Sequence, residues 1–153
     1  MAGELEVTIA LLHGVNLNML GVRDPEHYDT MTLAELEGSV VIEARAAGLA
    51  CISFQTNHEG ELVEKIQELR ERAAGMIINP GAWTHYSYAI RDALELVEGP
   101  VVEVHLSDVE SRPEEWRHHS VIRDVCDYMV AGKGAAGYSE AVEWLAERLK
   151  PAG

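Results

Sequence analysis

The sequence predicts a three-layer α/β sandwich around a parallel sheet, and two observations indicate this class. Short apolar runs rich in β-branched residues alternate with longer segments of helical periodicity along the chain. Such alternation is typical of parallel strands joined by right-handed crossover helices. The chain has 153 residues and is 47% hydrophobic, which suits one domain with a sizeable core. We therefore expect residues 1–153 to form a single domain.

The elements follow from these patterns. Five apolar runs are short enough to be strands buried on both faces of a sheet: Leu5–Leu12, Leu49–Phe54, Met76–Ile78, Val101–Val104 and Tyr128–Ala131. Four segments carry helical patterns: Leu33–Ala47, Glu59–Ala74, Tyr86–Val97 and Ser139–Leu149. A Thr32-x-x-Glu35 capping box opens the first helix, and Gly75 closes the second. We expect the flavodoxin-like strand order 2-1-3-4-5 for these runs.

Composition narrows the possible partners and the compartment. The formal charge of −14 opposes binding to nucleic acid, because that affinity comes largely from Lys and Arg. Cys51 and Cys126 are too few for a disulfide framework and lack the paired spacing of a zinc site. No apolar run approaches the roughly 18 residues of a spanning helix, and the N-terminus lacks a basic leader. We expect a soluble, cytoplasmic protein that binds neither nucleic acid nor membrane.

Groups of polar residues follow three of the predicted strands. They occur in the long loop from His13 to Tyr28, in the turn from Asn79 to His85, and from His105 to Ser107. Each group alone also has a structural explanation: a turn at Asn79, a helix N-cap at Thr84, or a satisfied core histidine. Ligands of such sheets bind beyond the strand ends where strands 1 and 3 separate the two winding directions. The sequence therefore predicts a site at this edge.

Four ordered segments resemble the signature blocks of type II 3-dehydroquinate dehydratases, also called type II dehydroquinases. The segments are Gly14–Tyr28, Ile78–Ser87 with Arg91 and Asp92, Val102–Ser107, and Trp116–Ser120. The match covers nearly the whole chain. It implies a flavodoxin-like fold, a dodecamer built from trimers, no cofactor or metal, and the dehydration of 3-dehydroquinate to 3-dehydroshikimate in the shikimate or quinate pathway.

The resemblance also implies the catalytic roles. A proton is removed next to the ketone, an enolate forms, and the C1 hydroxyl leaves. Tyr28 matches the base, and since a free phenol has a pKa of about 10, the nearby cation Arg23 is needed to populate tyrosinate. Asn16 matches the residue that stabilises the enolate. His105 matches the acid that protonates the departing hydroxyl, a role suited to a side chain that titrates near neutrality.

The remaining matches are to positions where the family holds its substrate. Asn79, Ser107 and the backbone amide of Leu106 match the carboxylate site. Arg117 and His85 match residues that grip the ring hydroxyls, and Asp92 resembles an acid contributed to a neighbouring subunit. Two of these residues have plain structural alternatives: Arg117 as part of a solvated helix face, and Asp92 as a surface carboxylate paired with Arg91 or a helix neighbour.

Several departures from the family pattern lie near the expected ring-binding side. Val15 stands where the family usually has Pro, Trp83 and Tyr86 occur inside the third-strand block, and the segment from Arg112 to Arg117 is one residue longer than usual. A paralogue that dehydrates a related cyclic hydroxy-keto acid is therefore an alternative.

Rival functions meet specific objections. Residues 132–137 fit G-x-G-x-x-G, but a ribose-binding acid should follow about 20 residues later and the chain ends at Gly153, so a tight turn that lets the last helix pack closely is the preferred interpretation. A non-catalytic receiver-like module, with Lys133 as its lysine, needs acidic residues where His13, Asn16 and Asn79 stand. A metal hydrolase that uses His105, His118 and His119 lacks any known ligand spacing.

Overall fold

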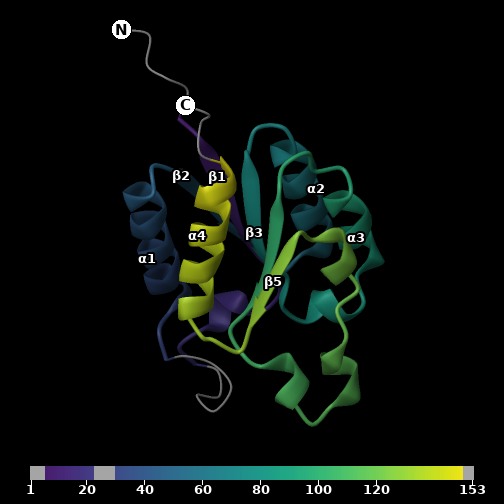
Figure 1. The fold of residues 1–153 in the computed structure, drawn as a ribbon. Coiled ribbons are helices and arrows are strands. Elements are labelled where there is room, and N and C mark those ends of the chain that lie inside the picture. Colours follow the sequence, from purple (N-terminus) through teal and green to yellow (C-terminus); the bar gives the residue numbers. More distant parts are fainter. Residues whose placement is uncertain (1–5, 23–29, 150–153) are drawn as a thin grey trace, which may run out of the picture.

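The computed structural model describes residues 6–22 and 30–149. Within these ranges the strands form one parallel sheet of five strands in the order β2-β1-β3-β4-β5. Helices α1 and α4 cover one face of the sheet and α2 and α3 the other (Figure 1). The fold class and strand order predicted from the sequence are confirmed.

The strands are β1 (Thr8–His13), β2 (Ala50–Gln55), β3 (Gly75–Asn79), β4 (Val101–His105) and β5 (Tyr128–Ala131). The α-helices are α1 (Leu33–Ala46), α2 (Glu59–Leu69), α3 (Tyr88–Leu94) and α4 (Ala136–Leu149). Short 3-10 helices occupy the connections: η1 (Leu17–Met19), η2 (Gly81–His85), η3 (Val109–Ser111), η4 (Glu115–His118) and η5 (Arg123–Val125). No helix in the described ranges is long and apolar enough to cross a bilayer.

Alternation along the central strands builds two cores. Ile9 and Leu11 of β1 face α1 and α4, whereas Ala10 and Leu12 face α2 and α3. Strands β1, β3 and β4 are almost wholly buried. The expectation that every strand is buried on both faces is wrong for β2 and β5, which are only partly buried because they form the two edges of the sheet.

Helix boundaries differ from the prediction where local hydrogen bonds decide them. The side chain of Thr32 accepts the backbone N–H of Glu35, which confirms Thr32 as the N-cap of α1, and Oε1 of Glu35 accepts from the Thr32 hydroxyl at 3.2 Å. Helix α3 begins two residues later than predicted, because Ser87 Oγ accepts the N–H of Ile90 and acts as the N-cap. The interpretation of Thr84 as an N-cap is therefore wrong.

The second and fourth helices also differ in length from the prediction. Helix α2 ends at Leu69 rather than Ala74, and the N–H of Ala74 already bonds to the carbonyl of Thr8 in β1. Helix α4 begins three residues earlier than predicted, at Ala136.

The glycines of residues 132–137 make a turn and a close helix contact. Gly132 and Gly134 have φ angles of 79° and 57°, in the left-handed region that favours glycine. A Cβ on Gly137 would lie 3.2 Å from Cγ1 of Val130, so glycine lets α4 pack closely on β5. The interpretation of this segment as a tight turn with close helix packing is confirmed.

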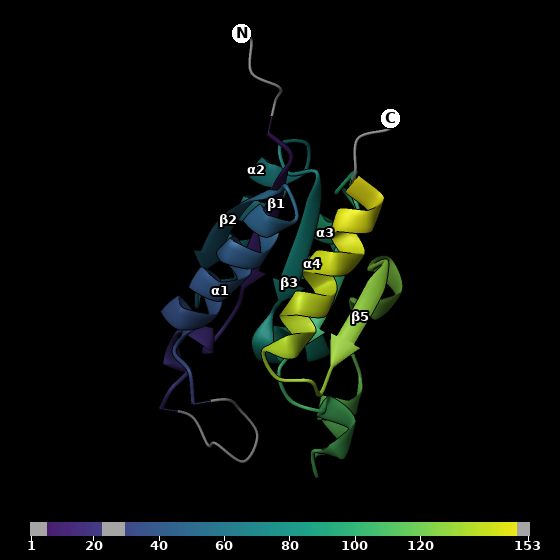
Figure 2. The same cartoon turned by 60° about the vertical axis from the view of Figure 1, so that its left-hand side comes forward.

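Because all five strands are parallel, their carboxyl ends lie on the same side of the sheet, which we call its carboxyl edge. His13, Asn79 and His105 are the last residues of β1, β3 and β4, and His13 and Asn79 are register partners. The view in Figure 2 shows α1 and α4 side by side in front of the sheet, with η3 and η4 near the carboxyl end of β4. This edge therefore gathers the side chains that follow the three central strands.

Candidate active site

A cleft opens beyond the carboxyl ends of the central strands. Its walls come from the loop after β1, the turn after β3, the residues after β4, and η4. The residues predicted from the sequence that line it are Asn16, Asn79, His85, His105, Leu106, Ser107 and Arg117. The structure thus brings together residues that are 101 positions apart in the chain, as the parallel topology predicted.

Three of the predicted site residues are not among those that the structure places at the cleft, and for two of them it makes no statement. Tyr28 and Arg23 lie outside the described residues. Asp92 is exposed on α3 and is not among the described residues that line the cleft. The alternative pairing partner of Asp92, the guanidinium of Arg91, forms ion pairs with Asp124 and Glu95.

The departures from the family pattern occupy different places. Val15 lines the cleft, whereas Trp83 is buried in the core on the α2 and α3 side and Tyr86 is 58% exposed. Arg112, at the start of the lengthened segment, also lines the cleft. Of these positions, Val15 and Arg112 therefore affect the shape of the cleft directly.

Residues at and just after the end of β2 hold Asn16 by hydrogen bonds. Asn16 has a φ of 68°, a left-handed conformation that Asn tolerates better than most residues. Its backbone N–H donates to Oδ1 of Asn57 at 2.9 Å, and Nε2 of Gln55 donates to the same oxygen at 3.1 Å. Gln55 Nε2 also lies 3.1 Å from the carbonyl oxygen of Gly14. These contacts hold the backbone of Asn16 in a fixed place at the cleft.

Asn79 is held by both ends of its amide. The side chain is 4% exposed, its Oδ1 accepts the N–H of Gly81 at 3.1 Å, and its Nδ2 donates to the hydroxyl of Tyr138 at 3.0 Å. Gly81 has a φ of 66°, and a Cβ there would lie 2.5 Å from the carbonyl oxygen of Val15. The turn after β3 therefore requires glycine at this position in order to hold Asn79.

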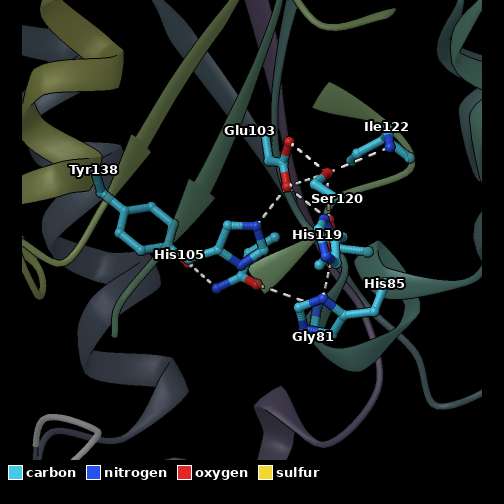
Figure 3. Close-up of polar contacts among 10 residues, drawn as sticks. Gly81, His85, Glu103, His105, His119, Ser120, Ile122 and Tyr138 are labelled. Atoms are coloured by element: carbon cyan, nitrogen blue, oxygen red, sulfur yellow. Dashed lines mark hydrogen bonds and ion pairs between the residues drawn. The ribbon is translucent and has the colours of Figure 1, made fainter. Parts of the chain in front are cut away.

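His105 is bound to a buried carboxylate. Its Nε2 lies 2.5 Å from Oε2 of Glu103, and the hydroxyls of Thr84 and Ser120 donate to the same oxygen at 2.6 and 2.8 Å (Figure 3). Glu103 is fully buried, so its charge must be satisfied by these donors. This arrangement fixes the imidazole and leaves Nδ1 as its other polar atom.

The donors around Glu103 outweigh its burial. Burial is the largest single influence and raises the pKa of the carboxyl group, but the hydrogen bond and charge of His105, with the hydroxyls of Thr84 and Ser120, hold that pKa below its ordinary value.

Sequence reasoning missed Glu103. The available signal was a lone carboxylate between Val102 and Val104 in a strand expected to be buried on both faces.

His85 presents an unprotonated nitrogen. Its Nδ1 donates to the carbonyl of His119 at 2.7 Å, and its ring packs edge-on against Trp116 with centroids 5.1 Å apart. Burial lowers the pKa of His85, and the positive charges of His105 and Arg117 lower it further, against the raising effects of the His119 carbonyl and of Glu103. At neutral pH the ring therefore offers Nε2 as a hydrogen-bond acceptor.

Arg117 lies over an aromatic ring at the mouth of the cleft. Its guanidinium carbon is 4.3 Å from the ring centroid of Trp116, its Nε is 3.2 Å from Oε2 of Glu114, and its side chain is 22% exposed. The alternative that placed Arg117 on a solvated helix face is therefore wrong: the residue belongs to η4 and lines the cleft.

Comparison with known proteins gives a consistent result. The family described as Dehydroquinase class II matches residues 7–146. The chain is 47% identical over 142 residues to a 3-dehydroquinate dehydratase of Pelobacter propionicus, covering 92% of this chain and 95% of that protein. It is 48% identical over 145 residues to 3-dehydroquinate dehydratase 2 of Pseudomonas aeruginosa, covering 95% and 97%. A catabolic 3-dehydroquinase 1 of Aspergillus terreus is 47% identical over 143 residues, covering 94% and 93%.

Solved structures agree with the sequence matches. The type II dehydroquinase of Propionibacterium acnes superposes with a TM-score of 0.89 at 37% identity, covering 95% of this chain and 99% of that one. That of Butyrivibrio crossotus gives 0.88 at 40% identity, covering 92% and 97%. With the cleft at the carboxyl edge of a 2-1-3-4-5 sheet, these matches show that the chain belongs to the dehydroquinase class II family.

Proposed function

We propose that this chain is a hydro-lyase that converts 3-dehydroquinate into 3-dehydroshikimate. The observation that carries the proposal is the cleft in which His105, bound to the buried carboxylate of Glu103, lies with Asn16 and Asn79 at the carboxyl edge of the sheet. Relatives at 47–48% identity over nearly the whole chain are named 3-dehydroquinate dehydratase, which supports the same reaction.

His105 is suited to protonate the departing hydroxyl. The carboxylate of Glu103 accepts a hydrogen bond from Nε2, which leaves Nδ1 as the ring nitrogen that can donate to the substrate. The imidazole can then give the proton on Nδ1 to the leaving oxygen while Glu103 stabilises the charge that it carries before the transfer. Glu103 thus acts through His105 as a positioning residue.

The opposite half of the reaction is assigned to the loop after β1. Tyr28 is the base that removes the proton next to the ketone, and Arg23 favours the tyrosinate form through its positive charge. Asn16, held at the cleft by Asn57, stabilises the enolate by hydrogen bonding. The assignments of Tyr28 and Arg23 rest on the signature loop alone, because both residues lie outside the described ranges.

Neutral donors are assigned to the substrate carboxylate. The amide of Asn79, the hydroxyl of Ser107 and the backbone N–H of Leu106 belong to residues that line the cleft where β3 and β4 end. Arg117 and His85 line the same cleft and are assigned to the ring hydroxyls. Arg117 supplies N–H donors and His85 supplies the Nε2 acceptor, so the pair can bind hydroxyls in both directions.

The quaternary structure is part of the proposal. We infer that residues 1–153 act as one domain in a cytoplasmic homo-oligomer, a dodecamer built from trimers. Asp92 supports this, because it is exposed on α3 and does not belong to the described lining of its own cleft. Its carboxylate can reach a ring hydroxyl only when a neighbouring subunit places it there.

The deciding experiment follows the enone absorbance of the product during incubation with 3-dehydroquinate. Wild-type protein should show turnover, and a His105→Ala variant of unchanged fold should lose at least two orders of magnitude in kcat. No turnover at high enzyme concentration would refute the proposal. Because Val15 lines the cleft where the family usually has Pro, related cyclic hydroxy-keto acids are the next substrates to assay in that case.

A further inference from the structure

A buried phenol connects Asn79 to a histidine that the proposed chemistry does not use. Tyr138, near the start of α4, is 1% exposed, and its hydroxyl lies 3.0 Å from Nδ2 of Asn79 and 2.9 Å from Nε2 of His13. His13 is fully buried at the end of β1. Figure 3 shows the ring of Tyr138 reaching from α4 toward the site that contains His105.

The donor and acceptor of each hydrogen bond between Gly81, Asn79, Tyr138 and His13 can be assigned by starting from Gly81. The backbone N–H of Gly81 can only donate, so the group of Asn79 that faces it at 3.1 Å is Oδ1. The Nδ2 group therefore faces Tyr138 and donates to its oxygen. Burial raises the pKa of Tyr138, so its hydroxyl keeps its own proton. Since Nδ2 of Asn79 is a donor, the acceptor among the described partners of this hydroxyl is Nε2 of His13.

This order also fixes the tautomer of His13. Because Nε2 accepts the proton of Tyr138, the ring proton is on Nδ1. That nitrogen lies 3.7 Å from Oε1 of Glu37, whose side chain is 25% exposed on α1. The hydrogen bonds thus run in one direction from the turn after β3, through α4, to β1, and they end at His13, whose Nδ1 has no hydrogen-bond partner among the described residues.

The consequence for the cleft is a fixed donor. An asparagine amide has two N–H groups, and within the described residues Tyr138 takes one of them. Since Asn79 lines the cleft, the other is left for a ligand. We propose that Tyr138 and His13 are positioning residues that hold the Asn79 amide with this N–H directed at the carboxylate of the substrate.

The identity of that ligand rests on the function proposed above. The orientation of the Asn79 amide does not depend on that function. If the amide were reversed, its NH2 group would face the N–H of Gly81, and two donors would meet without an acceptor. Tyr138 secures the same orientation from the other side, because its own proton is engaged by His13. Removing the phenol oxygen leaves the buried N–H of Asn79 without a partner, so the amide loses this restraint.

The test compares KM with kcat. Tyr138→Phe keeps the volume of the ring and removes the acceptor, so KM for 3-dehydroquinate should rise about tenfold while kcat stays within about twofold, as expected when uniform binding is lost. The control is Tyr128→Phe, because the hydroxyl of Tyr128 donates to Glu140 and Tyr128 is not among the described residues that line the cleft. This control should leave KM unchanged.

A second pair of variants tests the role of His13 without changing Tyr138. His13→Leu removes the acceptor and should raise KM as Tyr138→Phe does. His13→Gln places an amide oxygen near the position of Nε2 and should restore KM to within about threefold of wild type. If His13→Leu and Tyr138→Phe both turn over with wild-type KM, the positioning role is refuted while the dehydratase function stands.

Ring-nitrogen NMR of ligand-free wild-type protein decides the hydrogen-bond direction independently of activity. We expect the signal of a protonated Nδ1 and a bare Nε2 at His13. A proton on Nε2 would overturn the inference even if the enzyme is active. If the expected tautomer is seen and 3-dehydroquinate is not turned over, the proposed function fails while the orientation of Asn79 stands.

Discussion

The Nε2 atom of His105 and the Oε2 atom of Glu103 are 2.5 Å apart, although the two residues belong to one strand and are separated by Val104. In a strand, residues i and i+2 lie on the same face, so β4 itself places the carboxylate beside the imidazole. The bond therefore needs no loop to form it, and its geometry is as rigid as the sheet.

The variant Glu103→Gln should show how much the negative charge of Glu103 matters for catalysis, because it removes the charge and keeps the size and hydrogen-bonding shape of the side chain. The amide oxygen can replace Oε2 toward His105 and Thr84, and the new NH2 group can donate to Ser120, whose hydroxyl lies 3.0 Å from Oε1. We expect a folded protein with kcat lowered about tenfold or more, because the protonated imidazole loses its counter-charge.

Steady-state kinetics measure this effect, with thermal melting as the check on the fold. An unchanged kcat in a folded Glu103→Gln protein would show that the carboxylate does not assist His105.

The contrast between Asn79 and Glu103 shows what the sequence could predict. Asn79, His85 and His105 were predicted to lie together and do line one cleft, because each follows or ends a central strand and parallel strands have their carboxyl ends on one side of the sheet. Glu103 lies within a strand, where residue type alone does not say whether a carboxylate is exposed or buried with donors. The donors Thr84 and Ser120 are 19 and 17 positions away, so only tertiary folding reveals them.

Tyr138 illustrates the same limit. It lies one residue before the predicted helix Ser139–Leu149 and is the third residue of the observed α4, so periodicity does not distinguish it from any other core residue. Its role depends on partners in β1 and β3 that are 125 and 59 positions away. The prediction that β2 and β5 are fully buried has a different reason: burial was inferred from each apolar run alone, although the predicted order 2-1-3-4-5 already placed these two strands at the borders of the sheet.

His85 should make stability depend on pH in a defined window. Its pKa in the folded protein lies below the ordinary value, mainly because of burial, so the folded state favours the neutral ring. The contribution of neutral His85 to the free energy of unfolding is complete above the pKa of about 6.5 that the residue has in the unfolded chain. This contribution is lost as the pH falls from there through the pKa of His85 in the folded protein. Between pH 7.5 and 5.5 wild type should therefore lose more stability than His85→Gln, which does not titrate.

Urea unfolding at the two pH values measures this difference, and a ring-nitrogen titration locates the pKa of His85 directly. The positive charge of Arg117 contributes to the lowering, so Arg117→Gln should raise the pKa of His85 somewhat whereas Arg117→Lys should not. A His85 ring that titrates at or above the free value would contradict the assignment of Nε2 as an acceptor.

Tyr28→Phe should preserve substrate binding and lower kcat by two or more orders of magnitude, which is the usual scale for a lost general base. Arg23→Ala should have a similar effect, with residual activity that rises with pH as the uncompensated phenol ionises. Enzyme assays from neutral pH upward measure both variants. More than about a tenth of wild-type kcat in Tyr28→Phe would remove Tyr28 from the mechanism.

Asp92 allows a test of the shared site by complementation. If Asp92 serves a neighbouring subunit, Asp92→Ala and His105→Ala should each impair activity, and co-refolded mixtures should regain part of it. In a mixed oligomer some sites combine His105 from one subunit with Asp92 from another. Sedimentation of wild type should show an oligomer. A fully active monomer, or mixtures no more active than their components, would rule out the shared role.

The ketone of 3-dehydroquinate could also be activated by forming an imine with a lysine, whose nitrogen then accepts the electrons. The lysines of this chain argue against that mechanism. Nucleophilic attack needs a neutral amine. Lys133 instead has its Nζ 2.5 Å from Oε1 of Glu140, and this hydrogen bond, with the charge of the carboxylate, raises its pKa above the ordinary value. Lys65 is paired with Glu68 at 2.9 Å on α2, and neither amine belongs to the described lining of the cleft.

Borohydride should therefore leave the enzyme active when it is added together with 3-dehydroquinate, because there is no imine to reduce. Residual activity and intact mass measure the outcome, with borohydride alone as the control for nonspecific damage. Lys150 lies outside the described residues, so peptide mapping must include the C-terminal peptide. A substrate-dependent loss of activity with an adduct on Lys133 would replace the enolate mechanism by an imine, whereas an adduct without loss of activity would mark a side reaction at an exposed amine.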